Sequence, residues 1–163
     1  MQRIKKLMII AMLACACAPT FAQKTTQQQR YDEQFRQAMD LYHKAKYVAA
    51  QHQFDLLVEA AERGATTCDA RYYAAVCSQQ LGSGDAMYRM EEFLRLYPES
   101  SHANMVRFYE GCYYYGRGEY SLALEKFKLV EQSEIEYSHR DEYDYKMGYA
   151  YLNIGEREKD KAS

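Results

Sequence analysis

The strongest constraint on the fold is a pair of residues that recurs every 36 or 37 positions. An alanine stands at Ala50, Ala86 and Ala123, and a bulky residue follows each of them four positions later. Those bulky residues are Phe54, Met90 and Phe127. Self-similarity at such a period indicates a repeat architecture, in which each unit packs on its neighbours. The repeat therefore has to be interpreted before any single motif.

Another small residue precedes each of these three alanines, and a fourth lies in the incomplete last unit. This second set comprises Ala38, Ala74, Gly111 and Gly148. A turn is predicted between the two sets, at Gly118 and Gly155, with Ala45 and Leu81 in the other copies. Apolar residues at three- and four-residue spacing flank these turns, as in YYAAVC and FYEGCYYY. Each unit is therefore predicted to be two short helices joined by a turn.

Helix packing gives a physical reason for small and large residues one turn apart. A residue with almost no side chain lets the neighbouring backbone approach, and a large residue beside it fills the remaining space. One helix pair cannot bury such a face alone, so the copies have to stack. The pattern predicts an all-α fold. GRGEYSLALEKF, residues 116–127, is the turn and second helix of the third unit, and none of its residues needs a catalytic role.

This pattern resembles the tetratricopeptide repeat over roughly residues 31–155. The matching stretches are AMDLYHKAKYVAAQHQF, AAVCSQQLGSGDAMYRMEEFLRLYP, GCYYYGRGEYSLALEKF and GYAYLNIGE. The usual tryptophan is absent, and the closing proline appears only as Pro98. Gln34, Ala70, Arg107 and Asp144 occupy the place of the tryptophan. The resemblance implies a solenoid of antiparallel helix pairs with about three and a half repeats, similar to the N-terminal part of exported tetratricopeptide-repeat proteins of Bacteroidetes-type bacteria.

The repeat domain is predicted to cover residues 30–155. Its units lie at about 31–66, 67–103, 104–140 and, incompletely, 141–155. The first helix of the incomplete unit is expected from about His139 to Ile154, and residues 156–163 form a charged tail or a truncated helix. Two alternatives remain open: the chain is a fragment of a longer repeat protein, or the last helix acts as a cap.

Residues 1–22 have the layout of a secretory signal peptide. A basic head precedes an apolar run from Leu7 to Ala18, and small residues stand before a cut after Ala22. The run is too short to cross a bilayer, which takes about 20 residues. Cleavage there leaves a polar linker over 23–29 and places the protein in the periplasm or cell envelope.

Two cysteines leave another form of export open. Cys15 and Cys17 lie within the apolar segment, so acylation of either would make the chain an outer-membrane lipoprotein. Neither matches a lipobox fully, because Leu13 is one place out of register for Cys15 and no leucine stands three before Cys17. A membrane partner is expected only with such lipidation.

The net charge argues against nucleic-acid binding, and the number and spacing of the cysteines limit the possible disulfides. Removing residues 1–22 takes three positive charges from a net charge of −2, which leaves −5. An acidic chain with no basic stripe is a poor nucleic-acid binder. Three cysteines remain, and Cys68 and Cys77 lie too far apart on one helix to bridge. Cys77 and Cys112 are interpreted as small buried hydrophobic residues, with a bridge between them as the alternative.

Catalytic and cofactor motifs are absent from the sequence. The four histidines include no pair at the i, i+4 spacing of a zinc site, and no CxxC occurs. Asp141, Glu142 and Asp144 near His139 could hold a cation, but acidic residues there more often complement the start of a helix. We therefore expect neither enzyme activity nor a cofactor.

The resemblance places a concave groove along the first helices of the units. It implies that this groove holds a protein partner, as an extended peptide or a helix, and aromatic and Met side chains there suit such recognition. The predicted groove residues are Phe35, Met39, Tyr42, Arg71, Phe108, Tyr115, Tyr145 and Tyr149. The expected function is an exported scaffold or adaptor, and the alternative is a structural or self-associating repeat module.

Overall fold

The computed structural model describes the chain over residues 18–60 and 64–162, with side chains over 26–60 and 64–155. Every regular element in these ranges is helical, as predicted. The α-helices are α2 (Ala18–His43), α3 (Tyr47–Ala60), α4 (Ala65–Gln80), α5 (Ala86–Leu96), α6 (Ala103–Gly116), α7 (Tyr120–Phe127) and α8 (Arg140–Ala162). Two short 3₁₀ helices, η1 (Gln132–Glu134) and η2 (Tyr137–His139), lie between α7 and α8.

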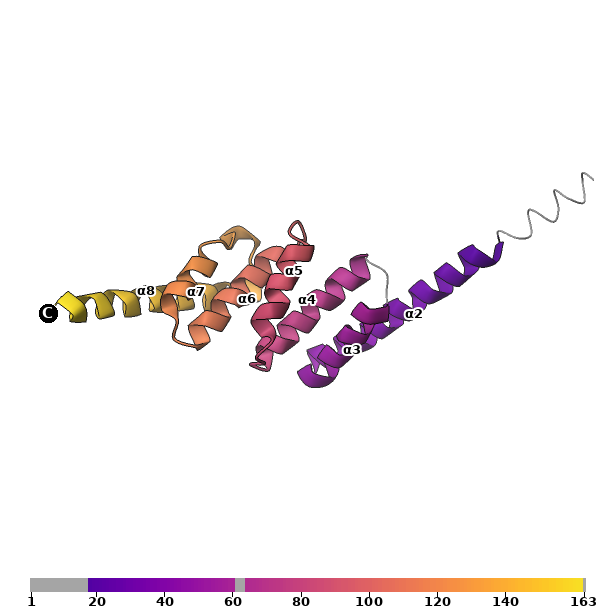
Figure 1. Cartoon of the computed structure of the whole chain (residues 1–163), viewed down its shortest axis with the longest axis horizontal. Helices are drawn as coiled ribbons and strands as arrows, with labels where there is room; N and C mark the ends of the chain where they lie inside the picture. The colour runs from indigo at the N-terminus through magenta and orange to yellow at the C-terminus, as the bar shows by residue number, and fades with distance from the viewer. Residues whose placement is uncertain (1–17, 61–63, 163) are drawn as a thin grey trace, which may run out of the picture.

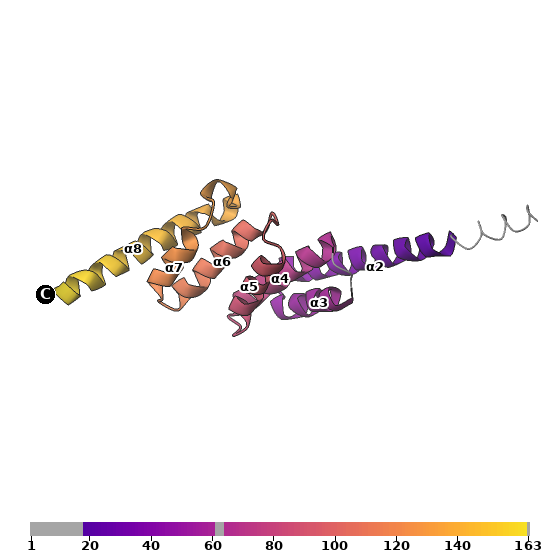
Figure 2. The same cartoon turned by 45° about the horizontal axis from the view of Figure 1, so that its top comes forward.

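The helices form an elongated row, with each helix packed on the next one along the chain (Figure 1). Contacts also join α2 to α4, α4 to α6, and α6 to α8. The first helix of each pair therefore touches the first helix of the next. Figure 2 shows α6, α7 and α8 together at one end of this row.

In the first three helix pairs, the turn that joins the two helices has the same hydrogen-bond pattern. The backbone φ angle is 54° at Ala45, 63° at Gly82 and 72° at Gly118. After each, an N–H donates to a carbonyl five residues earlier, at 2.9 to 3.0 Å: Lys46 to Leu41, Ser83 to Ser78 and Glu119 to Tyr114. This is the pattern of a Schellman helix end, for which glycine is preferred because it has no Cβ. The second turn is therefore centred on Gly82, one residue after the predicted Leu81.

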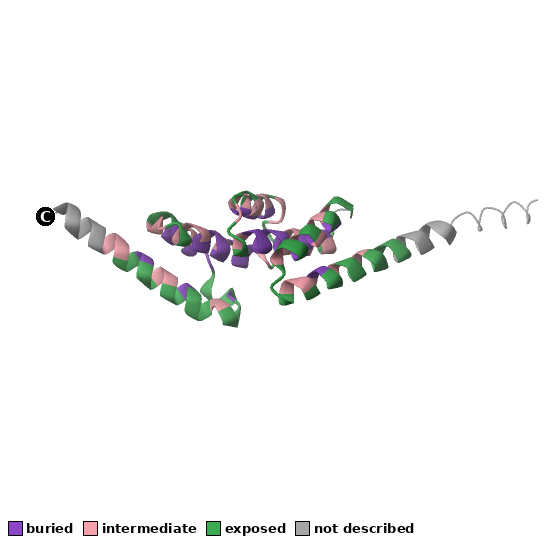
Figure 3. Cartoon of the chain, turned by 90° about the horizontal axis from the view of Figure 1, so that it is seen from below, coloured by how far each residue is buried: buried purple, intermediate pink, exposed green. Residues whose placement is uncertain are grey.

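The repeated alanines and bulky residues lie in the core, as predicted. Ala50, Ala86 and Ala123 are fully buried, and the bulky residues that follow them are at most 1% exposed. One buried cluster joins α2, α3 and α4, and a larger one runs from α4 to α8. In Figure 3 the buried residues concentrate in the middle of the row, over α4 and α6.

The predicted linker at 23–29 is part of a helix. Helix α2 runs through it without a break, because glutamine is a good helix former and its amide can bond one turn on. Gln27 donates to the Tyr31 hydroxyl at 2.7 Å, and Gln28 donates to Asp32 at 2.9 Å. Most of the predicted signal peptide, including Cys15 and Cys17, lies outside the described residues.

The last helix is longer than expected. Helix α8 continues through Gly155, where a turn was predicted, and reaches Ala162. A single glycine inside a helix costs only about 1 kcal/mol, and the residues after Gly155 are mostly strong helix formers. The predicted fourth turn is therefore wrong, and the fourth unit is one long helix.

The segment between α7 and α8 is held by buried side chains. The Asn104 amide donates to the Glu131 carbonyl at 3.0 Å and accepts from the Glu131 N–H at 2.7 Å. The Tyr143 hydroxyl donates to the Phe127 carbonyl at 3.1 Å. Ile135, in the same segment, is 2% exposed. These contacts fix the path that lays α8 across α6 and α7.

Candidate functional site

The sequence predicts one groove lined by eight side chains, and the structure divides these residues among several places. Phe35, Met39 and Tyr42, on α2, are half-buried and pack against the core shared by α2, α3 and α4. The ring centroid of Phe35 lies 5.6 Å from that of Phe54 and 6.0 Å from that of Tyr73. These three side chains serve packing, and their role in binding stays a prediction.

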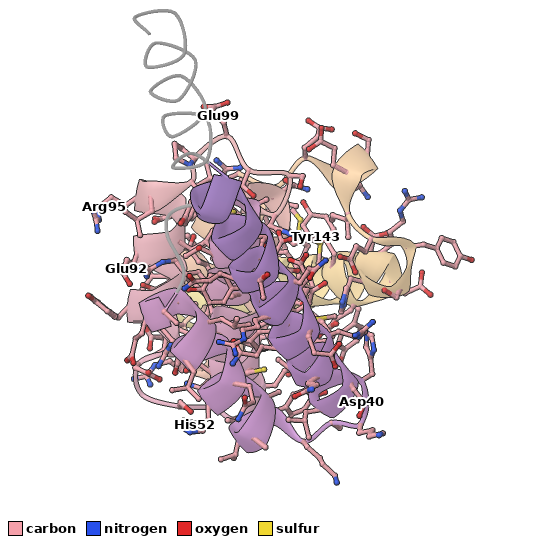
Figure 4. All side chains as sticks on the ribbon, turned by 90° about the vertical axis from the view of Figure 1, so that its right-hand side faces the viewer. Asp40, His52, Glu92, Arg95, Glu99 and Tyr143 are labelled. Carbon is pink, nitrogen blue, oxygen red and sulfur yellow. The ribbon has the colours of Figure 1, made fainter. Side chains whose placement is uncertain are left out.

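Arg71, on the first helix α4, points toward the second helices α3 and α5. Its Nη1 is 3.4 Å from Oε2 of Glu92 on α5. With Asp55 and Arg89 it lines a small pocket between α3, α4 and α5. Viewed along the row, Glu92 and Tyr143 lie on opposite sides of the array (Figure 4). The guanidinium of Arg71 therefore contacts a carboxylate on α5, and its role in partner binding stays a prediction.

The charges around this pocket satisfy one another. Arg89 donates to both carboxylate oxygens of Asp55, at 2.7 and 3.1 Å, and to Asp85 at 2.6 Å. The Ser78 hydroxyl donates to Asp85 at 2.5 Å. The bond from Ser78, together with Arg89, lowers the pKa of Asp85. The network joins α3, α4 and α5, and we interpret it as structural.

Phe108 is a core residue. It is fully buried, with its ring centroid 6.2 Å from that of Phe127 and 6.4 Å from that of Tyr143. Helix α8 packs across α6 and covers this position. The prediction that Phe108 projects into a groove is therefore wrong.

The remaining predicted residues meet in one place, with a fourth tyrosine. We call Tyr115, Tyr120, Tyr145 and Tyr149 the tyrosine cluster. The rings of Tyr115, Tyr120 and Tyr149 contact one another edge to face, with centroids 5.7 to 5.8 Å apart. Tyr145 stacks on Tyr149 at 6.0 Å. Tyr145 is 64% exposed and Tyr149 is 40% exposed, so the cluster presents aromatic surface to solvent.

A lysine, Lys146, contacts the tyrosine cluster at the Tyr115 ring. The Lys146 ammonium lies 5.4 Å from the Tyr115 ring centroid and 2.6 Å from Oε1 of Glu142. Burial acts to lower the pKa of Lys146, but the bond to Glu142 outweighs it and the pKa rises. Partial burial and the neighbouring tyrosines raise the pKa of Tyr115. The surface therefore offers tyrosine hydroxyls and rings beside a lysine that is paired with Glu142.

Two contacts between histidine and tyrosine join successive units, and the sequence analysis missed them. We call them the His–Tyr clasps. The His102 ring stacks on Tyr72 with centroids 4.1 Å apart, and the His139 ring meets Tyr109 at 5.8 Å. The signal was present in the sequence: both histidines and both tyrosines are 37 residues apart, the step of the repeat.

Each clasp also contains a carboxylate. His102 Nε2 lies 3.0 Å from Oδ1 of Asp69. His139 lies between Oε2 of Glu142 and the Tyr109 hydroxyl, each at 3.3 Å. A chain of carboxylate, histidine and tyrosine groups can relay protons where it is open to solvent. Here Tyr109 is only 4% exposed, and burial raises its pKa. We therefore interpret the clasps as connections between units.

The three cysteines that the structure describes, Cys68, Cys77 and Cys112, are free thiols. Cys77 and Cys112 are buried, as predicted, and burial raises the pKa of each to about 12. Cys68 is half-buried and lies 3.5 Å from the Ser100 hydroxyl. Across the described residues, no group of three or more His, Cys, Asp or Glu side chains could hold a metal ion.

Comparison with known proteins gives no relative from which a function could be transferred. No protein-family model, no curated protein and no solved structure matches the chain. In the part of the chain that the structure describes, no helix is both long and apolar enough to cross a membrane. Among the described surfaces, the tyrosine cluster combines exposure with contributions from three helices.

Proposed function

We propose that this chain is an exported scaffold of tetratricopeptide type that binds a protein partner through the tyrosine cluster. The solenoid interpretation is supported by the period of 36 to 37 residues, the three equivalent helix ends and the contacts between alternate helices. A stack of this kind is rigid along its length, so it can hold side chains from different units in one fixed arrangement.

The observation that carries the proposal is the preorganised, partly exposed set of tyrosines. Tyr115, Tyr120 and Tyr149 support one another edge to face, so little side-chain entropy is lost when a partner covers them. Tyrosine offers apolar ring area together with a hydroxyl that can bond a backbone. Such residues are enriched where binding energy is concentrated in protein interfaces. The partner class is therefore a protein segment.

Removal of two rings tests this proposal. In the double variant Tyr115→Ala/Tyr149→Ala we expect affinity for the captured partner to fall about thirtyfold, which corresponds to about 2 kcal/mol. Affinity capture from cell-envelope extract, with quantitative mass spectrometry, measures the loss. Tyr149 is 40% exposed, but Tyr115 packs against the larger core cluster, so the helical circular-dichroism signal should persist while the melting temperature falls by a few degrees.

The matched control is Tyr88→Ala, on α5. Tyr88 is 66% exposed and lies outside the tyrosine cluster, so its removal should leave capture unchanged. Equal capture by the double variant and the native protein contradicts the proposed site. A double variant that unfolds shows instead that Tyr115 and Tyr149 belong to the core.

Export is part of the same proposal, and it is supported by the basic head, the apolar run and the small residues before Gln23. N-terminal sequencing of the exported protein should find Gln23 as the first residue. A mature chain that begins with an acylated Cys15 or Cys17 makes the protein a lipoprotein at the membrane surface. A chain that retains Met1 in the cytoplasm overturns export.

A further inference from the structure

Helix α8 has an apolar face that the rest of the chain does not cover. Its packed side carries Tyr143 and Ala150, which are 6% and 0% exposed. On the opposite side Tyr145 is 64% exposed and Leu152 is 59% exposed. In Figure 3 the described part of α8 is exposed along much of its length, unlike α4 and α6.

This side of the α8 backbone has a regular pattern of positions. Six positions alternate at spacings of four and three residues, which is the seam of a helix that pairs with another helix. They are Asp141, Tyr145, Gly148, Leu152, Gly155 and Lys159. At Gly148 and at Gly155, a Cβ atom would have nothing within 4 Å. The seam therefore carries two large side chains, Tyr145 and Leu152, and two glycines with free space beside them.

We propose that two copies of this chain associate through α8, with the two helices antiparallel. In the register that sets position 148 opposite position 152, Leu152 of each copy lies over Gly148 of the other. The same register sets Tyr145 over Gly155 and the acidic Asp141 opposite position 159, a lysine in the sequence. Every large residue then meets a glycine, and the formal charges at the two ends are opposite.

A second copy is favoured as the occupant because the seam complements itself. A two-fold dimer has to bring the same surface together from both subunits, so large must face small and acid must face base within one sequence. Moving the register by one heptad sets Leu152 opposite Asp141, or sets Lys159 opposite Gly148, and loses the match. Only the central register satisfies all three kinds of pair.

The positions of the other helices allow this arrangement. Helices α6 and α7 pack near the start of α8, and α8 runs past the end of α7 toward the C-terminus (Figure 1). Antiparallel pairing therefore places the bodies of the two copies at opposite ends of the joined helices. The seam shares Tyr145 with the tyrosine cluster but does not include Tyr115 or Tyr149, so Leu152→Asp and the double variant Tyr115→Ala/Tyr149→Ala test the two proposals separately.

Analytical ultracentrifugation of the full chain over a range of concentrations tests the pairing. We expect the mass to rise from the 19.1 kDa of one chain to twice that value. Leu152→Asp should raise the dissociation constant at least tenfold, since an interface core residue is lost twice by symmetry (about 1.4 kcal/mol or more). Val48→Asp, at a 70% exposed position on α3, is the matched control and should leave the dissociation constant unchanged.

Exchange of the two end charges tests the register. Asp141→Lys and Lys159→Asp should each weaken the dimer about fivefold, because like charges then meet at both ends. The double variant Asp141→Lys/Lys159→Asp should restore the native dissociation constant within about twofold. A single-chain mass at all concentrations up to about 1 mM, or equal effects of Leu152→Asp and Val48→Asp, overturns the dimer. A double variant as weak as the single ones overturns the antiparallel register.

Discussion

Replacing Phe127 with alanine is expected to lower the free energy of unfolding by about 3–5 kcal/mol. Phe127 is fully buried, and its ring centroid lies 5.6 Å from that of Tyr143 on α8 and 6.2 Å from that of Phe108 on α6. Its ring also covers the backbone of Gly111. Helix α7 has only eight residues, so it depends on this side chain for its position. Truncation would leave a cavity at the meeting point of three helices.

Urea unfolding followed by circular dichroism measures this loss, and the matched control is Leu129→Ala. Leu129 comes two residues later and is 62% exposed, so its truncation should change the unfolding free energy by no more than about 0.5 kcal/mol. If the two variants were equally stable, Phe127 would not be the residue that joins α6, α7 and α8.

The helix pairs could be predicted because their pattern is local. Small residues that recur at one spacing, each followed by a bulky one, require helices that pack closely. The structure buries Ala50, Ala86 and Ala123 accordingly. The first three turns were predictable to within one residue, whereas the turn predicted at Gly155 is wrong because α8 runs through it. The middle turn shows the limit: the sequence suggested Leu81, but the adjacent Gly82 adopts the left-handed conformation, which favours glycine.

It was less predictable which side chains of the first helices face solvent and which face the core. Whether Phe108 faces solvent or core depends on the segment between α7 and α8, which lays α8 over it. That path is fixed by the Asn104 amide, which binds the backbone of Glu131 across 27 residues. The contact of Arg71 with Glu92 was not predictable for a similar reason, since Glu92 comes from α5. The spacing of residues shows which side chains share one face of a helix, but not which other element packs on that face.

The tyrosine cluster was partly predictable. Tyr115 and Tyr149 were expected to come from neighbouring first helices, and their ring centroids lie 5.8 Å apart. Tyr120 was not expected there, because it was interpreted only as part of the repeat. The His–Tyr clasps do not follow from metal-ligand spacing, at which the sequence has no pair of histidines. A comparison at the 37-residue step would have paired His102 with His139.

The other large effect is expected at Gly111, where even one added carbon has no room. A Cβ atom there would lie 2.3 Å from Cδ1 and 2.4 Å from Cε1 of the Phe127 ring. The ring cannot move away, because it is fully buried between α6 and α8. Gly111→Ala should therefore destabilise the protein by about 1–3 kcal/mol through overpacking, and Gly111→Leu by more.

Gly116, on the same helix, supplies the matched control. A Cβ atom there would have nothing within 4 Å, so Gly116→Ala should be neutral or stabilise the protein by up to about 1 kcal/mol, as is usual for glycine to alanine in a helix. The same chemical change is thus expected to act in opposite directions five residues apart. Thermal melts of the two variants, followed by circular dichroism, measure both signs. A stabilised Gly111→Ala variant would show that α6 and α7 do not approach through this glycine, and the small-residue interpretation of the repeat would fail with it.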